Sequence, residues 1–295
     1  MSFLLSLIAK SIAGALQLSV LPRLRACPDK SLDIPSRDAG RSIKLDIYYS
    51  STPSQTSPVL VNFHGSGFLV PLHGSDGEFC RRISRKTSYT VLDVQYRLTP
   101  ENPYPAAPND AEDVVHWVQE QQRQGLEFTD GRIALSGFSA GGNLSLGAPP
   151  QFPSGTFHAI LAFYPWLDLD KNPWFKFAPN PLSLSMPAWV LDICRRCYLV
   201  NGEDARDPRV SPVFAPVERF PERVYVATAS CDTLAFEGEE LVKRMNQAPE
   251  RRRSAESERM GWLCGHGWDK FAFWGTPWWW TKERAYTKAV ALLES

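Results

Sequence analysis

Short apolar runs that alternate with helix-like segments dominate the hydrophobic pattern of this chain. Residues 43–48 alternate apolar and polar side chains, which is typical of a strand with one buried face. Five further runs are almost entirely apolar and are predicted to be buried strands: 58–63, 89–96, 132–136, 158–164 and 224–229. Three segments have a helical pattern: 111–122, 236–245 and 283–293. Strands that alternate with helices indicate βαβ units, so we expect a mostly parallel sheet with helices on both faces.

Two stretches interrupt this alternation. Residues 22–42 are polar and contain three prolines, so they are predicted to form a loop. Residues 167–216 are rich in proline, tryptophan and aspartate and hold no clear strand, so we interpret them as an insertion. Together with the N-terminal segment, this insertion can form a lid.

Residues 1–21 are apolar except for a few polar positions, with Lys10 in the middle. A signal peptide carries its positive charge before the apolar run, and none is found there. A central lysine would cost a membrane-spanning helix about 2.5–3.5 kcal/mol. Apolar residues recur at helical spacing: Leu5, Ile8, Ile12, Leu16 and Val20. We therefore expect an amphipathic helix that covers another surface of the protein. Membrane association through residues 1–21 is the alternative.

Length and charge narrow the class of protein. A chain of 295 residues with 43% hydrophobic residues can bury a sizeable core, in one large domain or two small ones. The 32 basic and 32 acidic residues give a formal net charge of zero. Because a neutral chain has no overall field to attract phosphate backbones, nucleic acid is not an expected partner.

The six cysteines are scattered along the chain and do not resemble a disulfide framework. Cys194 and Cys197 form a lone CxxC motif, without the second cysteine pair or paired histidines of a structural zinc site. We expect reduced and mostly buried thiols, and no metal.

The clearest chemical signal is the pattern G-x-S-x-G at residues 137–141, which places Ser139 directly after the predicted strand 132–136. A strand before this motif and a helix start after it are the context of a nucleophile elbow. Its glycines permit a tight turn, and the helix N-terminus favours developing negative charge at the serine. The alternative is an ordinary turn rich in glycine and serine.

A serine needs a base to become a nucleophile. Of the five histidines, only His266 lies in a late, glycine-flanked loop. The others fall in a helix, in a strand or in earlier loops, so His266 is the expected base. The chain order Ser, acid, His then places the acid between 139 and 266. Asp232 follows the strand 224–229, at the edge where sites of open α/β sheets form. Asp204 and Asp207 in the insertion are its rivals, and capping a helix is the alternative role for Asp232.

The sequence His64-Gly65-Ser66-Gly67-Phe68 also follows a predicted strand. Small residues there allow backbone N–H groups to approach a substrate oxyanion, and the loss of one such donor lowers the rate about 10²–10³-fold. A flexible glycine loop is the alternative interpretation.

In combination these motifs resemble the hormone-sensitive-lipase-like branch of the α/β-hydrolases, which includes arylacetamide deacetylase, and in particular its fungal-type esterases. The motifs that carry the resemblance are HGSGF at 64–68, YRLTPE at 96–101, GFSAGGN at 137–143, Asp232-Thr-Leu234 with Glu237-Gly238, and His266-Gly267. The resemblance covers roughly residues 43–293. It implies the α/β-hydrolase fold in a single domain over 1–295, with a helical cap formed by about 1–35 and 167–216.

The resemblance also implies roles for individual residues. Ser139 would be the nucleophile, His266 the base and Asp232 the residue that orients it. The oxyanion hole would use backbone N–H groups of Gly65, Ser66 and Ala140. No cofactor is implied. Glu101 would hold the loop behind the elbow in place.

The chain departs from the family pattern in three places. Ser66 stands where the family has glycine, and Phe138 stands where it has aspartate. The family also has a long helix after the elbow, whereas residues 143–157 contain two consecutive prolines, so this helix is predicted to have only about two turns.

These features predict a serine hydrolase that cleaves carboxylic esters of small apolar substrates. Amide hydrolysis with the same triad, or a ligand-binding protein on the same fold that has lost catalysis, are the alternatives. Fungal secondary-metabolite clusters often carry short esterases of this kind, which is an analogy at family level. We expect a small-molecule ester as partner, a chain compatible with a homodimer, and a cytoplasmic location unless residues 1–21 bind a membrane.

Overall fold

The apolar runs of the sequence become the strands of one sheet in the computed structural model, which describes residues 10, 11, 14, 17, 26–52, 56–180, 185–248, 254–261 and 263–295. The strands are β1 (Lys30–Pro35), β2 (Ser42–Tyr48), β3 (Ser57–Phe63), β4 (Thr90–Val94), β5 (Phe128–Phe138), β6 (Phe157–Phe163), β7 (Arg223–Ala229) and β8 (Ser254–Met260). All six strands that the hydrophobic pattern predicted are present.

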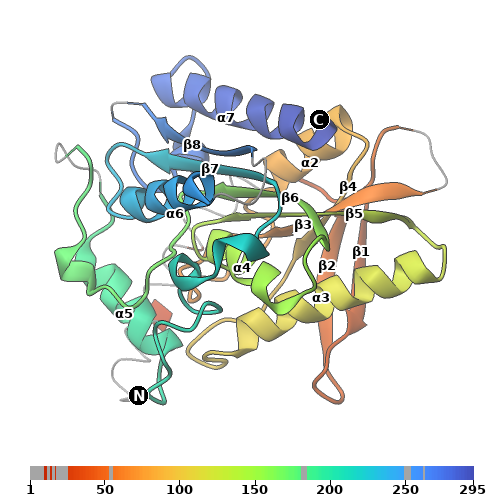
Figure 1. Cartoon of the computed structure of the whole chain (residues 1–295), viewed down its shortest axis with the longest axis horizontal. Coiled ribbons are helices and arrows are strands. Elements are labelled where there is room, and N and C mark those ends of the chain that lie inside the picture. The colour runs from red at the N-terminus through yellow and green to blue at the C-terminus, as the bar shows by residue number, and fades with distance from the viewer. Residues whose placement is uncertain are drawn as a thin grey trace.

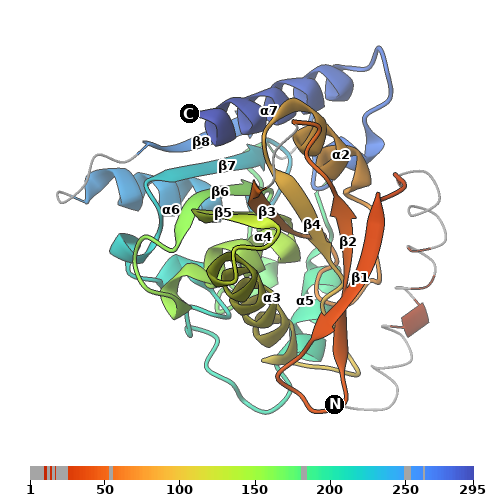
Figure 2. The same cartoon turned by 90° about the vertical axis from the view of Figure 1, so that its right-hand side faces the viewer.

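The order of the strands in the sheet is β1-β2-β4-β3-β5-β6-β7-β8. The first two strands pair antiparallel with their neighbours, and every pair from β4 to β8 is parallel. Figure 2 shows β1 at one edge and β8 at the other, with a strong twist between them. The predicted α/β architecture with a mostly parallel sheet is thus confirmed.

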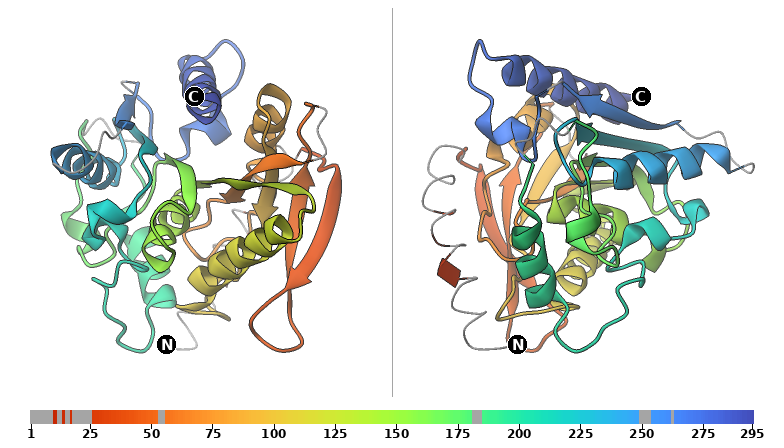
Figure 3. Two further views of the ribbon diagram at one scale, coloured as in Figure 1. Left: turned by 45° about the vertical axis from the view of Figure 1, so that its right-hand side comes forward. Right: turned by 90° about the vertical axis from the view of Figure 1, so that its left-hand side faces the viewer.

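Helices cover both faces of this sheet. They are α2 (Gly77–Lys86), α3 (Ala106–Arg123), α4 (Ala140–Gly147), α5 (Ala188–Tyr198), α6 (Ala235–Gln247) and α7 (Pro277–Glu294). Helices α2 and α7 pack on one face, whereas α3, α4 and α6 pack on the other (Figures 1 and 3). Each face has its own core of buried side chains, so the central strands are apolar on both sides.

The prediction of a loop over residues 22–42 was wrong for its middle part. Residues 30–35 form strand β1, which pairs antiparallel with β2. Strand β8 was missed altogether, and its sequence Ser-Ala-Glu-Ser-Glu-Arg-Met carries three charges. Both are edge strands with one exposed row of side chains, so polar residues replace the apolar pattern that identifies a buried strand.

Because residues 30–35 belong to the sheet, the N-terminal part of the expected cap cannot extend to residue 35. Most of the amphipathic helix predicted for residues 1–21 lies outside the described residues. Of that segment, Lys10 is described, and its ammonium lies 2.6 Å from the carboxylate of Glu101. Among the described helices, none has both the length and the apolar character that crossing a bilayer would need.

Candidate active site

Ser139 occupies the tight turn between β5 and α4. Its φ of 52° lies in the left-handed region, which a serine adopts only where the surrounding structure enforces it. Close backbone contacts do so: a Cβ on Gly141 would lie 1.9 Å from the carbonyl oxygen of Phe63, and one on Gly137 would lie 2.1 Å from that of Gly141. The glycines of the motif are therefore a steric requirement, and the turn has the strand–turn–helix context that the sequence predicted.

The structure brings His266 and Asp232 to this serine. The Nε2 atom of His266 lies 2.8 Å from the Oγ atom of Ser139, and its Nδ1 atom lies 2.8 Å from the Oδ2 atom of Asp232. An ionised carboxylate can only accept, so Nδ1 donates to Asp232 and Nε2 is left to accept the serine proton. The three side chains follow β5, β7 and β8, so they meet at the carboxyl edge of the sheet.

Asp232 is fully buried, and it holds its own turn together as well as facing the histidine. Its second carboxylate oxygen accepts the backbone N–H of Leu234 at 3.0 Å. Helix α6 begins one residue later with Leu234 as its N-cap residue, so Asp232 is not a helix cap. The rivals Asp204 and Asp207 have other partners: Asp204 accepts the backbone N–H of Arg206, and Asp207 accepts the backbone N–H of Arg209 and the hydroxyl of Tyr104.

The three expected oxyanion donors lie on two adjoining backbone segments. The loop after β3 packs against the elbow, since a Cβ on Gly65 would lie 3.3 Å from the carbonyl oxygen of Phe138. Within the described part of the chain, the backbone N–H groups of Gly65, Ser66 and Ala140 donate to no acceptor. Oxyanion donors need backbone N–H groups without an internal acceptor, and these three meet that requirement.

Comparison with known proteins identifies the family. Residues 60–264 match a family model described as the α/β-hydrolase fold, which is more than half of the chain. The chain belongs to the α/β-hydrolase family. The matched family is the hormone-sensitive-lipase-like branch that the motifs indicated.

Relatives of this α/β-hydrolase carry names of ester-cleaving enzymes. It is 30% identical over 212 residues to the carboxylic ester hydrolase LipN of Mycobacterium tuberculosis, covering 68% of this chain and 55% of that protein. It is 27% identical over 214 residues to an AB hydrolase superfamily protein of Schizosaccharomyces pombe, covering 68% of this chain and 61% of that protein. The match thus spans less than two thirds of the length of these relatives.

Solved structures agree over a larger share of the chain. An esterase of Pyrobaculum calidifontis superposes with a TM-score of 0.79 at 25% identity, covering 100% of this chain and 93% of that one. The carboxylesterase EstE1, cloned from a metagenomic library, superposes with a TM-score of 0.76 at 24% identity, covering 99% and 97%.

The side chain of Ser66 is hydrogen-bonded to Tyr96 and within its own loop. The hydroxyl of Tyr96 donates to the carbonyl oxygen of His64 at 2.6 Å, so it can only accept from the Ser66 hydroxyl at 2.7 Å. The Oγ atom of Ser66 accepts the backbone N–H of Phe68 at 2.8 Å. The serine that replaces the family glycine thus links its loop to Tyr96 and to the backbone of Phe68.

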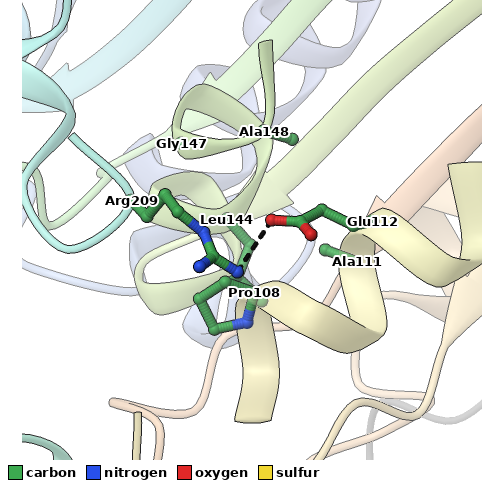
Figure 4. A pocket seen from close by; sticks show the side chains of 7 residues that line it. All are labelled: Pro108, Ala111, Glu112, Leu144, Gly147, Ala148 and Arg209. Carbon is green, nitrogen blue, oxygen red and sulfur yellow. Dashed lines mark ion pairs between the residues drawn. The ribbon is translucent and has the colours of Figure 1, made fainter. Parts of the chain in front are cut away.

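The short helix after the elbow has the predicted two turns. Helix α4 has eight residues, all buried, and a 3₁₀ turn at Pro149–Gln151 follows it. Where a longer helix would continue, Arg209 from the segment 167–216 lies against α4 and donates to Glu112 at 2.8 Å and to Asn109 at 2.6 Å. Figure 4 shows the ion pair of Arg209 and Glu112 at the small indentation between α3 and α4. This indentation has a volume of only about 10 Å³, and all eight residues of the short helix are buried.

Phe138, which replaces the family aspartate, is fully buried among other aromatic rings. Its ring stacks on Phe163 with centroids 4.5 Å apart and meets Phe79 edge-on at 5.3 Å. The ammonium of Lys270 lies 4.0 Å from the centre of the Phe138 ring, within cation–π range. The position before the nucleophile therefore contacts a cation through its ring face.

The segment 167–216 contacts both halves of the site. Tyr198 of α5 stacks on Phe68 with ring centroids 3.9 Å apart. Phe68 belongs to the loop at residues 64–68, which carries two of the expected oxyanion donors and is called the oxyanion loop below. On the other side, the hydroxyl of Ser185 donates to the carbonyl oxygen of Cys231 at 2.9 Å, and Cys231 directly precedes Asp232 in the turn that carries this carboxylate. This segment thus joins the oxyanion loop to the acid-bearing turn.

The remaining predictions have mixed outcomes. All six cysteines are free thiols and five are buried, including Cys194 and Cys197 on α5. Among the described residues, no cluster of histidine, cysteine, aspartate or glutamate has a metal-binding arrangement. The carboxylate of Glu101, which the resemblance assigned to the loop behind the elbow, is half-exposed and pairs with Lys10.

Sequence reasoning missed three side chains next to the histidine. Tyr164 packs its ring against His266, with centroids 4.8 Å apart. Asp269 and Lys270 lie on the same loop as the histidine and form an ion pair at 2.8 Å. The adjacent charges of Asp269 and Lys270, close after His266, could have drawn attention to this loop. The sequence gives no indication of what these two side chains contact.

Proposed function

We propose that this α/β-hydrolase is a serine carboxylesterase that cleaves esters of small apolar substrates. The observation that carries the proposal is the continuous hydrogen-bonded chain from Ser139 through His266 to Asp232, beside unoccupied backbone donors. The ester-cleaving names of its relatives support the same activity.

The proposed reaction has two acyl-transfer steps. Ser139 attacks the ester carbonyl while His266 takes its proton, and Asp232 keeps the imidazole in the required tautomer and stabilises the imidazolium. The backbone N–H groups of Gly65, Ser66 and Ala140 hold the oxyanion of the tetrahedral intermediate. His266 then protonates the leaving alcohol, and water releases the acid from Ser139 by the same route in reverse.

Burial of the reacting groups supports a small, apolar substrate. Ser139 is 7% exposed, and the side chain of His266 is 9% exposed. A site so enclosed excludes bulk water and admits a compact, uncharged acyl group at the least desolvation cost. We propose that the segment 167–216 is the cap that encloses it, since it contacts both the oxyanion loop and the acid-bearing turn.

The test is hydrolysis of p-nitrophenyl acetate and p-nitrophenyl butyrate by the wild type and by Ser139→Ala. We expect the variant to lose at least about 10³-fold in kcat, because the nucleophile is gone while the fold is kept. Equal rates in both proteins would contradict the proposal.

Labelling with a fluorophosphonate tests the same site without a chosen substrate. We expect the wild type to react and Ser139→Ala not to react. A protein that only binds ligands would leave both unlabelled. Rates on matched p-nitroanilide amides then distinguish an esterase from an amidase, since the same triad serves both reactions.

A further inference from the structure

Three non-glycine residues of the described chain have a positive φ: Phe68 at 61°, Ser139 at 52° and Tyr164 at 39°. A side chain in this region is strained, and such strain is concentrated at functional sites. The first two belong to the oxyanion loop and the elbow. The third, Tyr164, has no part in the reaction described above, so its strain calls for another explanation.

Tyr164 directly follows β6, the strand beside the elbow. Its backbone N–H donates to the carbonyl oxygen of Ala227 at 2.6 Å, which fixes the residue between β6 and β7. In this conformation the ring faces His266, with centroids 4.8 Å apart and planes at 64°. The strained backbone therefore places an aromatic ring against the imidazole of the proposed base.

The far end of the Tyr164 ring is fixed as well. Its hydroxyl donates to the Oδ1 atom of Asp269 at 2.5 Å, and Asp269 lies three residues after His266 on the same loop. The ring thus touches the imidazole on one side and is tied to the histidine loop on the other. A closed connection results, from His266 along the loop to Asp269, across to Tyr164 and back to His266.

Lys270 favours the ionised form of Asp269, which is the form that accepts the hydrogen bond from the Tyr164 hydroxyl. Its ammonium lies 2.8 Å from Asp269 and 2.6 Å from Asp76, which precedes α2. Although burial alone would raise the pKa of Asp269, the Lys270 ammonium and the phenol donors hold that pKa below its ordinary value. Asp269 is therefore an ionised acceptor for two phenols, those of Tyr164 and, at 2.7 Å, Tyr286.

We propose that Tyr164 is a positioning residue for His266. Its ring restricts rotation of the imidazole, so that Nε2 stays directed at Ser139 and Nδ1 at Asp232, and Asp269 holds the ring in place. The inference rests on the proposed function, because a fixed imidazole matters only if His266 transfers protons.

The chain offers a matched pair of variants. Tyr164→Phe and Tyr286→Phe each remove one phenol hydroxyl from the same carboxylate, but the structure records a contact with His266 only for the Tyr164 ring. If Asp269 merely stabilises the fold, both variants lose similar stability and neither changes catalysis. If Tyr164 positions the base, only Tyr164→Phe lowers kcat.

We expect Tyr164→Phe to lower kcat for p-nitrophenyl butyrate about threefold to tenfold, with KM within twofold of the wild type. Tyr164→Leu, which removes the ring, is expected to lower kcat by about 100-fold. Tyr286→Phe is expected to keep the wild-type kcat. Thermal unfolding of each variant shows how much stability the hydroxyl contributes.

A second measurement reads the imidazole directly. The proton that His266 Nδ1 donates to Asp232 is expected to give a far-downfield proton NMR signal in the wild type and in Tyr286→Phe. In Tyr164→Phe and Tyr164→Leu, a mobile imidazole is expected to broaden or abolish that signal. Equal kcat and equal downfield signals in the two phenylalanine variants would overturn the inference.

The two proposals can fail separately. A wild type without turnover that depends on Ser139 refutes the esterase, and the NMR comparison then decides alone whether Tyr164 fixes the imidazole. An active wild type with indistinguishable phenylalanine variants refutes the positioning role and leaves the esterase intact.

Discussion

The two halves of the candidate site are held by different physics. The elbow at Ser139 is fixed by backbone packed so closely that Gly137 and Gly141 have no room for a Cβ atom. The loop that carries His266 is fixed by a buried polar cluster, in which Asp269 and Lys270 reach Tyr164, Tyr286 and Asp76. One half depends on shape and the other on paired charge.

Because the interactions differ, the two halves are expected to respond differently to substitutions and to pH. Steric packing tolerates no added atom but is insensitive to pH. A buried ion pair tolerates changes of shape better, but it is costly to leave half-paired and responds to protonation. Substitutions can therefore address one half at a time.

The largest effect is expected at the elbow. Gly141→Ala places a Cβ on the carbonyl oxygen of Phe63, so we expect it to destabilise the fold by about 3 kcal/mol or more and to abolish turnover. Gly147→Ala in the same helix is the control, because its Cβ would meet nothing closer than 3.5 Å. Denaturant unfolding of both variants measures the effect, and similar stabilities would show that the elbow is not sterically fixed.

The next effect is expected at the buried cluster. Lys270→Met removes the cation that pairs with Asp76 and Asp269, so we expect a loss of about 3 kcal/mol at pH 7. Lys270→Arg keeps the charge and is expected to lose less. Urea unfolding at several pH values provides the measurement.

The sign of the pH dependence follows from Asp269. Its pKa in the folded protein is lowered, so the stability it contributes is present above its unfolded pKa and is lost as the pH falls through the folded value. In Lys270→Met the unpaired carboxylates can be neutralised by protons. We therefore expect the difference between wild type and Lys270→Met to shrink from pH 7 toward about pH 4. A difference that does not change with pH would mean that the cluster stabilises by packing alone.

The smallest effect is expected at Arg209, whose charged side chain lies against α4, the helix that follows Ser139. Arg209→Met removes the side chain that covers the end of α4, and we expect a loss of about 1 kcal/mol with kcat within twofold of the wild type. Arg196→Met, which breaks an exposed pair with Asp192, is the control and is expected to change stability by less than about 0.5 kcal/mol. A large loss of kcat in Arg209→Met would show that the short helix depends on this arginine to hold Ser139.

The sequence predicted those parts of the molecule whose signal is local. A buried strand must be apolar on both faces, so the five apolar runs were found, and β2 was found from its alternation of apolar and polar residues. The edge strands β1 and β8 carry polar residues and were not found. The elbow was found because its glycines are required at fixed spacing. The motifs, the chain order of α/β-hydrolases and the family resemblance also predicted Ser139, Asp232 and His266 as the reacting side chains, and the structure places these three within hydrogen-bond distance of one another.

What lies around those three residues was decided by tertiary structure. The hydroxyl of Ser66 is held by Tyr96, which is 30 residues distant. The role of Tyr164 depends on Asp269, which is 105 residues away. Side-chain contacts of this kind leave no periodicity and no spacing in the chain, because they are set by the packing of elements that the sequence specifies only one at a time. The sequence alone determined which residues could react, and the tertiary structure alone determined what holds them in place.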